Sequence, residues 1–365
     1  MKRRKLIDCC EFISDGDHLP PPKSTDGIPF ITISNITGQN KISFEDTMFV
    51  PKSYYDKLSE TKKARKGDIL YSVVGSFGKP VYVDFEIPMV FQRHIAILRP
   101  KCDVNGKYLY YTMLNSQFYR MMDKLAIGCS QRTVTLDTLR NIEVNLPDKD
   151  IQDQMVEILS LIDEKIDINN NVNDNLSAMA YDIYMHNFFS KKPNAKLKDI
   201  LTEAEKSAIQ VGEAKTSNGK YPFFTSGATI LKWNEPFVDG RNCFLNTGGN
   251  ADIKFYVGKA AYSTDTWSIS AKSKMSDYLY LMLFSIKPEL DQKFFQGTGL
   301  KHLQKPLLKD RPIYVPEKLE LEAFNRQVMP MFDIISENTR ENQQLTSLRD
   351  WLLPMLMNGQ ATISD

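Results

Sequence analysis

Hydrophobic residues recur at alternating spacings of four and three positions in two long stretches of the chain. This is the heptad spacing of a coiled-coil seam, so we predict two long helices, over residues 148–190 and 317–359. The predicted seam residues of the first helix are Met155, Ile158, Ile162, Asn169, Leu176 and Ile183. Those of the second helix are Phe324, Met331, Asn338, Leu345, Leu348 and Leu352.

The two predicted helices most simply pair with each other as an antiparallel coiled coil. Asn169 and Asn338 occupy equivalent seam positions, and a buried asparagine at such a position sets the register of a coiled coil. Pro330 lies inside the second heptad pattern, where it should kink the helix or delay its start because proline lacks a backbone donor. Two unrelated amphipathic helices, each packed on its own core, are the alternative.

The helices belong to a longer internal repeat. Residues 128–147 and 297–316 align without a gap at an offset of 169 residues. Both segments begin with a glycine, carry a basic residue and a short alternating strand, and end in a proline, Pro147 or Pro316. The same offset continues into the helices, where Met155 aligns with Phe324. An ungapped offset of this length argues for a duplicated unit.

The segments that precede the helices are mixed in character. The first contains short β-rich runs and one helical stretch, at 30–33, 68–74, 81–85, 95–98 and 107–125. The second repeats this theme more loosely, at 221–225, 242–246, 253–257 and 277–285. We therefore predict an α+β protein with a pseudo-twofold internal repeat. Its globular domains would span residues 1–147 and 191–316, and each would be followed by one of the long helices.

Composition excludes several classes of function without pointing to one. Lysine and arginine number 46 against 45 acidic residues, so the global charge gives no support for nucleic-acid binding, and any such surface must be local. The five cysteines contain no C-x-x-C pair and the four histidines are dispersed, which predicts reduced thiols in a cytoplasm and no metal site. No apolar run is long enough for a membrane span, and the basic N-terminus lacks the apolar segment of a signal peptide.

Two motifs resemble catalytic signatures but lack the required context. The segment from Phe295 to Gly299 matches the F-x-G-x-G turn of methyltransferases, but a basic and polar segment that leads to a strand follows it instead of a helix. The string Pro147-Asp148 followed by Asp163-Glu164-Lys165 matches a nuclease pattern, but these carboxylates fall on one predicted helix, about four turns apart. We therefore expect no catalytic site in this chain.

The doubled arrangement resembles the specificity (S) subunit of a type I restriction–modification system. The resemblance covers essentially the whole chain and rests on the segments around Pro147, Asn169 and Asn338, together with Lys66–Leu70 and Gly219–Gly227. It implies a DNA reader in which each globular domain recognises one half of a split, asymmetric target, while the helices set the spacing between the halves. It also implies two methyltransferase subunits and the motor-nuclease restriction subunits as partners, which would use S-adenosylmethionine, ATP and Mg²⁺.

We expect DNA contacts from polar and basic loops at corresponding places in the two domains, because such side chains pair with base edges and phosphates. In the first domain the candidates are Ser34, Asn35, Thr37, Arg93, His94, Ser130, Gln131, Arg132 and Thr133. In the second they are Thr225, Ser226, Asn246, Thr247, Asn250, Lys301 and His302. Two other functions stay open on sequence alone: a methyltransferase or nuclease in its own right, and a coiled-coil scaffold that does not read DNA.

Overall fold

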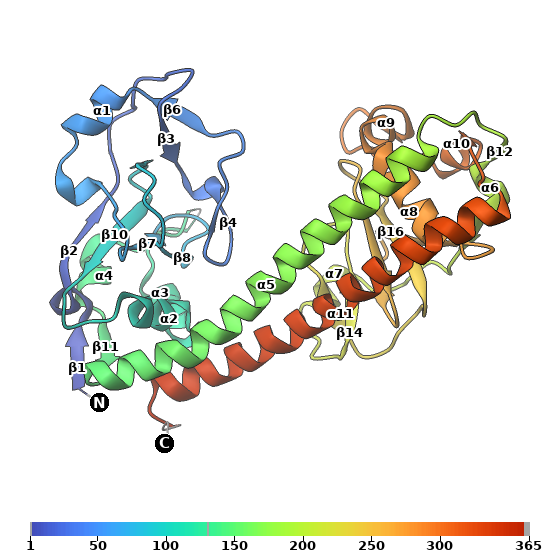
Figure 1. Ribbon diagram of the computed structural model, residues 1–365. Coiled ribbons are helices and arrows are strands. Elements are labelled where there is room, and N and C mark those ends of the chain that lie inside the picture. The colour runs from blue at the N-terminus through green and yellow to red at the C-terminus, as the bar shows by residue number, and fades with distance from the viewer. Residues whose placement is uncertain (1, 130, 361–365) are drawn as a thin grey trace. The chain divides into compact units, whose positions relative to one another are not determined.

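Two units of similar topology make up the protein, and the computed structural model describes residues 2–129 and 131–360. The first unit consists of Met1–Glu164 with Leu345–Asp365, and the second of Lys165–Gln344. Each unit contains one β-rich domain and one segment from each of the two long helices, α5 (Lys149–Phe188) and α11 (Lys318–Met357) (Figure 1).

The first unit is built on a four-stranded antiparallel sheet with the strand order β2-β10-β7-β8. These strands are β2 (Cys10–Asp15), β10 (Ile95–Pro100), β7 (Ile69–Ser72) and β8 (Pro80–Tyr82). A second sheet has the order β6-β3-β9, with β3 (Ile28–Ile31) antiparallel to β6 (Met48–Val50) and parallel to β9 (Val90–Phe91). The remaining strand pairs are β1 (Lys2–Lys5) with β11 (Glu143–Leu146), and β4 (Ile36–Gly38) with β5 (Lys41–Ile42).

The central strand β10 is apolar along most of its length because both of its faces are covered, and Ile95, Ala96, Ile97 and Leu98 are fully buried. The α-helices in the described part of this domain are α1 (Lys52–Lys57), α2 (Gly106–Leu114), α3 (Ser116–Leu125) and α4 (Leu136–Asn141), and it also has 3-10 turns at Leu6–Cys9, Ile33–Asn35 and Glu60–Lys62. Residues of α2 share a core with the sheet, and the same core takes in the start of α5 and the end of α11. The long helices are therefore part of the folded unit.

The second unit repeats this topology. Its four-stranded sheet has the order β13-β19-β16-β17, made of β13 (Leu201–Glu203), β19 (Thr266–Ala271), β16 (Arg241–Asn246) and β17 (Ile253–Val257). Its three-stranded sheet has the order β15-β14-β18, made of β15 (Leu231–Trp233), β14 (Tyr221–Phe224) and β18 (Ala261–Tyr262), again with one parallel and one antiparallel pair. The two-stranded pairs are β12 (Ala195–Lys196) with β22 (Pro312–Ile313), and β20 (Phe295–Gln296) with β21 (His302–Leu303).

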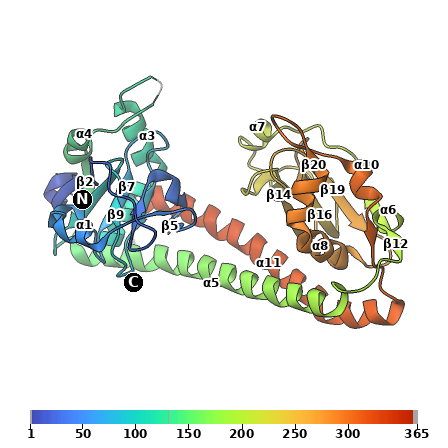
Figure 2. The same ribbon diagram turned by 90° about the horizontal axis from the view of Figure 1, so that it is seen from above.

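Short helices complete the second unit. They are α6 (Leu197–Ile200), α7 (Val211–Ala214), α8 (Ser276–Ser285), α9 (Lys287–Glu289), a π-helical turn at Leu290–Phe294, and α10 (Lys305–Lys309). Figure 2 shows α8 beside β16 and β19, and Tyr278, Leu279 and Met282 of this helix share a core with strand residues. In the part of the chain that the structure describes, no helix is long and apolar enough to span a membrane.

The structure confirms the mixed α+β fold with two β-rich domains and two long helices packed together. Both helices are 40 residues long, and α11 begins and ends 169 positions after α5, which is the offset of the sequence repeat. In the first unit Arg349 Nη1 lies 2.9 Å from Asp163 Oδ1, across the two helices. In the second unit Asn338 Nδ2 donates to Asn173 Oδ1 at 2.8 Å. The helices run antiparallel, because residue numbers increase along one helix in the direction in which they decrease along the other.

Two local expectations were wrong. The helix expected at 107–125 is split into α2 and α3 by Asn115, whose side chain caps the second of them by accepting from Gln117 N. Of the two effects expected of Pro330, a kink or a delayed start, the delayed start is wrong, because α11 already begins at Lys318. Val328 and Phe332 on either side of the proline are buried in the domain core, and Arg241 donates to Met329 O from the adjacent strand. Tertiary packing holds this segment helical against its local propensity.

Candidate nucleic-acid interface

Three loops meet at one end of the four-stranded sheet in the first unit. They are the glycine loop between β7 and β8 (residues 73–79), the turn between β9 and β10 (residues 92–95), and the hairpin loop at 127–133. Val73 N donates to His94 O at 2.9 Å, which joins the glycine loop to the turn. Gly75 N donates to Arg132 O at 2.9 Å, which joins it to the hairpin loop. Three segments far apart in sequence are therefore held together by backbone hydrogen bonds.

The second unit builds the same cluster. Its glycine loop is at 247–252, its turn at 263–266 and its hairpin loop at 296–302. Thr247 N donates to Asp265 O at 2.9 Å, and Gly249 N donates to Lys301 O at 3.0 Å. These bonds pair His94 with Asp265 and Arg132 with Lys301 as equivalent residues. Arg132 and Lys301 keep the offset of 169 residues, whereas His94 and Asp265 are 171 residues apart, so the loops preceding the hairpin have changed length.

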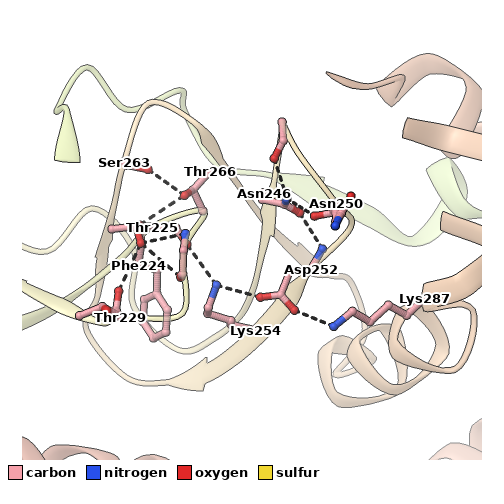
Figure 3. Close-up of polar contacts among 12 residues, drawn as sticks. Phe224, Thr225, Thr229, Asn246, Asn250, Asp252, Lys254, Ser263, Thr266 and Lys287 are labelled. Carbon is pink, nitrogen blue, oxygen red and sulfur yellow. Dashed lines mark hydrogen bonds and ion pairs between the residues drawn. The ribbon is translucent and has the colours of Figure 1, made fainter. Parts of the chain in front are cut away.

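Asn246, one of the expected DNA contacts, holds the second glycine loop from inside. Its Nδ2 donates to Gly248 O at 2.8 Å and to Asn250 O at 2.5 Å, and its Oδ1 accepts from Asp252 N at 2.7 Å (Figure 3). Only 4% of Asn246 is exposed, so its polar atoms are used within the loop.

Ser72 plays the corresponding part in the first unit, and the sequence did not single it out. Its Oγ accepts from Lys79 N at 2.9 Å and donates to Ser76 O at 3.2 Å, and the residue is fully buried. The available signal was a polar residue at the end of an apolar strand, directly before a glycine-containing loop.

Two further expected contacts, Asn35 and Thr225, are also buried and engaged in their own loops. Asn35 Oδ1 accepts from Thr32 N at 2.8 Å, and its Nδ2 donates to Ser43 O at 3.1 Å. Thr225 Oγ1 accepts from Gly227 N at 3.2 Å. Both side chains shape the loops that follow β3 and β14. Their polar atoms are therefore committed to the protein itself.

A chain of charges supports the loop at Thr225 (Figure 3). Lys254 Nζ donates to Thr225 O at 3.1 Å and lies 3.1 Å from Asp252 Oδ2, while Lys287 Nζ lies 2.9 Å from Asp252 Oδ1. Burial opposes ionisation of Asp252, but the two lysines outweigh that effect and lower its pKa. Asp252 is therefore ionised at neutral pH, and it ties the glycine loop to β17 and to the segment after α8.

The two equivalent cations of the hairpin loops are both held by carboxylates. Arg132 Nη1 lies 2.6 Å from Asp123 Oδ1, and Lys301 Nζ lies 2.8 Å from Asp291 Oδ2. The hydrogen bond from Lys301 lowers the pKa of Asp291. These cations are fixed in position, and part of their charge is already compensated.

The remaining expected DNA contacts lie at the surface or partly so. Those that are exposed are Ser34, Thr37, Arg93, Gln131, Asn250 and His302. Those that are half-buried are His94, Thr133, Ser226 and Thr247. Ser130 lies outside the described residues. Burial and the nearby Arg93 lower the pKa of His94, so this histidine is neutral at pH 7.

The predicted seam residues differ in burial along the two helices. Met155, Ile162, Asn169 and Phe324 are buried. Ile158, Leu176, Ile183, Met331, Asn338, Leu345 and Leu352 are half-buried. Leu348 is 45% exposed, and its neighbour Arg349 takes the buried position instead, with 5% exposure. Asn169 Nδ2 donates across the helix pair to Asn342 Oδ1 at 2.8 Å and to Glu341 Oε2 at 2.7 Å.

The described residues hold no group of three or more histidine, cysteine, aspartate or glutamate side chains that could bind a metal ion. The carboxylates of the nuclease-like string, Asp163 and Glu164, lie on α5, and Asp163 binds Arg349 and Tyr111. What the two loop clusters offer is hydrogen-bonding side chains on a fixed backbone, which suits recognition.

Comparisons with known proteins agree with this arrangement. The family model for the type I restriction modification DNA specificity domain matches residues 1–178 and 191–346. The HindI specificity subunit of Haemophilus influenzae is 22% identical over 84% of this chain and 89% of its own. The MjaIX specificity subunit of Methanocaldococcus jannaschii is 19% identical over 76% of this chain and 74% of its own.

A solved S subunit of the type I restriction–modification system from M. genitalium has the same fold, with a TM-score of 0.60 and 16% identity over 100% of this chain and 96% of that one. The family model covers both domains and most of both long helices. This chain therefore belongs to the type I restriction–modification DNA specificity family and is a non-catalytic specificity subunit.

Proposed function

We propose that the chain reads a split DNA target, with one half-site recognised by each globular domain. The recognition domains are residues 1–147 and 191–316, and the helical segments at 148–190 and 317–359 set the spacing between the half-sites. The observation that carries this proposal is the loop cluster that occurs twice on one strand order with different side chains. A duplicated scaffold with divergent loops is what two arms with different targets require.

The DNA-binding contacts come from the exposed and half-buried side chains of these clusters. In the first domain they include Arg93 and Gln131, and in the second Asn250 and His302. Arginine pairs with guanine edges, while asparagine and glutamine pair with adenine edges. Backbone amides of the glycine loops approach phosphates. Buried residues such as Asn246 act indirectly, by holding the loops in shape.

The chemistry belongs to partner subunits. Two methyltransferase subunits dock on the helices and domains and bring S-adenosylmethionine, and restriction subunits bring ATP and Mg²⁺. The exposed faces of α5 and α11 carry many acidic and amide side chains, which favour protein partners over phosphates. Placing acidic surface there explains how a DNA-reading chain can have a net charge of only +1.

DNA reading is tested by selection from a library of random duplexes, using the full chain with its methyltransferase partner. We expect enrichment of a target with two separate conserved parts. Retention of all sequences alike would favour a scaffold that does not read DNA. Calorimetry with S-adenosylmethionine and the isolated chain tests the other alternative, and measurable binding would favour a methyltransferase in its own right.

The role of the helices is tested by inserting one heptad into each, after Glu164 in α5 and after Gln344 in α11. These positions mark the division between the two units, so the domain cores stay intact. Seven residues lengthen a helix by about 10 Å, or roughly three base pairs of DNA. We expect a longer preferred spacer and unchanged half-sites. Changed half-sites with an unchanged spacer would contradict the proposal.

A further inference from the structure

The turn between β9 and β10 and the turn between β18 and β19 share one backbone bonding scheme. In the first unit Ile95 N donates to Gln92 O at 2.9 Å, and Arg93 N donates to Asp17 O at 3.0 Å. The carbonyl of His94 accepts from Val73 N at 2.9 Å. The backbone of the turn is therefore fixed from within, from the segment after β2, and from the glycine loop.

The second unit repeats each of these bonds. Thr266 N donates to Ser263 O at 3.1 Å, Thr264 N to Ile209 O at 2.9 Å, and Thr247 N to Asp265 O at 2.9 Å. The hydroxyls of Ser263 and Thr266, at the two ends of the turn, are also 2.9 Å apart (Figure 3). Because the backbone is the same in both units, the two turns differ mainly in the side chains at their tips.

These side chains differ in charge. The first turn carries Arg93 and His94, and the second carries Thr264 and Asp265 at the equivalent positions. Since His94 is neutral at pH 7, Arg93 makes the first tip positive, while Asp265 makes the second negative. Both Arg93 and Asp265 are exposed, and neither has an ion-pair partner among the described residues. Within the first turn Arg93 Nε donates to His94 Nε2 at 3.4 Å. The terminal guanidinium nitrogens of Arg93 and the carboxylate of Asp265 stay available to a ligand.

Phosphates repel a carboxylate. On a loop proposed to face DNA, a carboxylate without an ion-pair partner therefore points to a contact with a base and not with the phosphate backbone. Two lysines in or next to the second cluster are engaged by other carboxylates, Lys301 by Asp291 and Lys254 by Asp252, so these two do not neutralise Asp265. A carboxylate only accepts hydrogen bonds, and in the major groove it finds a matching donor in the amino group of cytosine. Adenine also has an amino group there, but its N7 acceptor lies beside it and disfavours a carboxylate. Arginine finds the opposite pattern in the two acceptors of guanine.

We propose that this turn is a specificity-determining position in both domains, where Arg93 selects a guanine in one half-site and Asp265 selects a cytosine in the other. The inference rests on the proposed function, since it assigns base chemistry to loops proposed to face DNA. The turn offers a fixed backbone from which a change of one or two side chains alters the base that is read, without altering the fold.

The test compares base preferences of the full chain with its methyltransferase partner, by selection from random duplexes. Arg93→Gln is expected to reduce the preference for guanine at one position of one half-site by about 5-fold to 150-fold, the range for loss of one bidentate base contact. Asp265→Asn is expected to reduce the preference for cytosine at one position of the other half-site. The matched charge controls are Arg3→Gln and Glu143→Gln, at two exposed residues of the β1–β11 pair, outside the loop clusters and the long helices, and they should change no preference.

A reciprocal graft makes the test sharper. Arg93→Thr combined with His94→Asp places the second turn in the first domain, and guanine should be replaced by cytosine at the same position. Unfolding midpoints within a degree or two of the wild type would show that the variants are folded. If the wild type selects a target but the variants and the graft keep every base preference, the proposal that this turn determines specificity is refuted. The proposed function would not be affected by that result. A uniform loss of affinity for all sequences would also overturn it, because it would indicate a phosphate contact. A wild type without any preference would refute the proposed function itself.

Discussion

Replacing Asn246 by alanine separates the residues that shape the recognition loops from those that are free to touch DNA. Asn246 and Asn250 lie on the same glycine loop, and the pattern of residue types alone makes both of them candidate base contacts. In the structure Asn246 is buried, with both ends of its amide bonded to the loop backbone (Figure 3). Asn250 is exposed. The two variants should therefore fail in different ways.

The expected size of the effect follows from the bonds that are lost. Asn246→Ala removes the hydrogen bonds to Gly248 O, Asn250 O and Asp252 N. At about 0.5–1.5 kcal/mol for each bond, the free energy of unfolding should fall by about 1.5–4.5 kcal/mol. Asn250→Ala removes an exposed side chain, so its cost should stay within about 0.5 kcal/mol.

Urea denaturation followed by tryptophan fluorescence measures this difference. Trp233 and Trp267 belong to the second unit, and Trp267 shares the core with Leu245, the residue before Asn246. Asn250→Ala should unfold like the wild type and instead weaken selection at the second half-site. The opposite result is equal stability of the two variants, with specific DNA binding lost only in Asn246→Ala. That result would refute the assignment of Asn246 as a residue that supports the loop. In that case Asn246 would have to touch DNA directly.

The remaining predictions concern the helix pair and the thiols. Asp163→Asn should lower the free energy of unfolding by about 3 kcal/mol, because it leaves the buried guanidinium of Arg349 with only Asp350 as its carboxylate partner. Adding Arg349→Met should recover part of that loss, and a cost below about 1 kcal/mol for the single variant in urea denaturation would contradict the importance of the pair. Burial raises the pKa of Cys9 to about 11 and that of Cys10 to about 12, and it also raises the pKa of Cys243. At pH 8 a thiol reagent should therefore label the exposed Cys102 and Cys129 in the folded protein and all five cysteines in urea, and equal labelling rates in both states would contradict this burial.

The elements that could be predicted from sequence are those with a strong local period. The helices were expected at 148–190 and 317–359 and are observed at Lys149–Phe188 and Lys318–Met357. Their heptad pattern repeats over many turns, so small irregularities do not hide it. Pro330 is one such irregularity, because neighbouring strands and Arg241 support the helix around it. Arg349 is another, since its burial depends on a partner that lies 186 residues away.

The loop clusters could be located only in part. The hairpin loops at 127–133 and 296–302 keep the constant offset of the repeat, so their equivalence is visible in the sequence. The glycine loops and the turns do not keep it, because the segments between them differ in length, and only the hydrogen bonds reveal which residues correspond. Burial also depends on the fold. For this reason the pattern of residue types could not separate Asn246, which supports the loop, from Asn250, which is exposed.

Exchanging residues 1–147 for the corresponding region of a relative with a different target tests the central claim most directly. The complex with the methyltransferase partner would be used to select duplexes from a random library, before and after the exchange. Independent arms predict that one half-site is replaced by that of the donor, while the other half-site and the spacer stay the same. A change in both half-sites would contradict the claim that each domain reads its own part of the target.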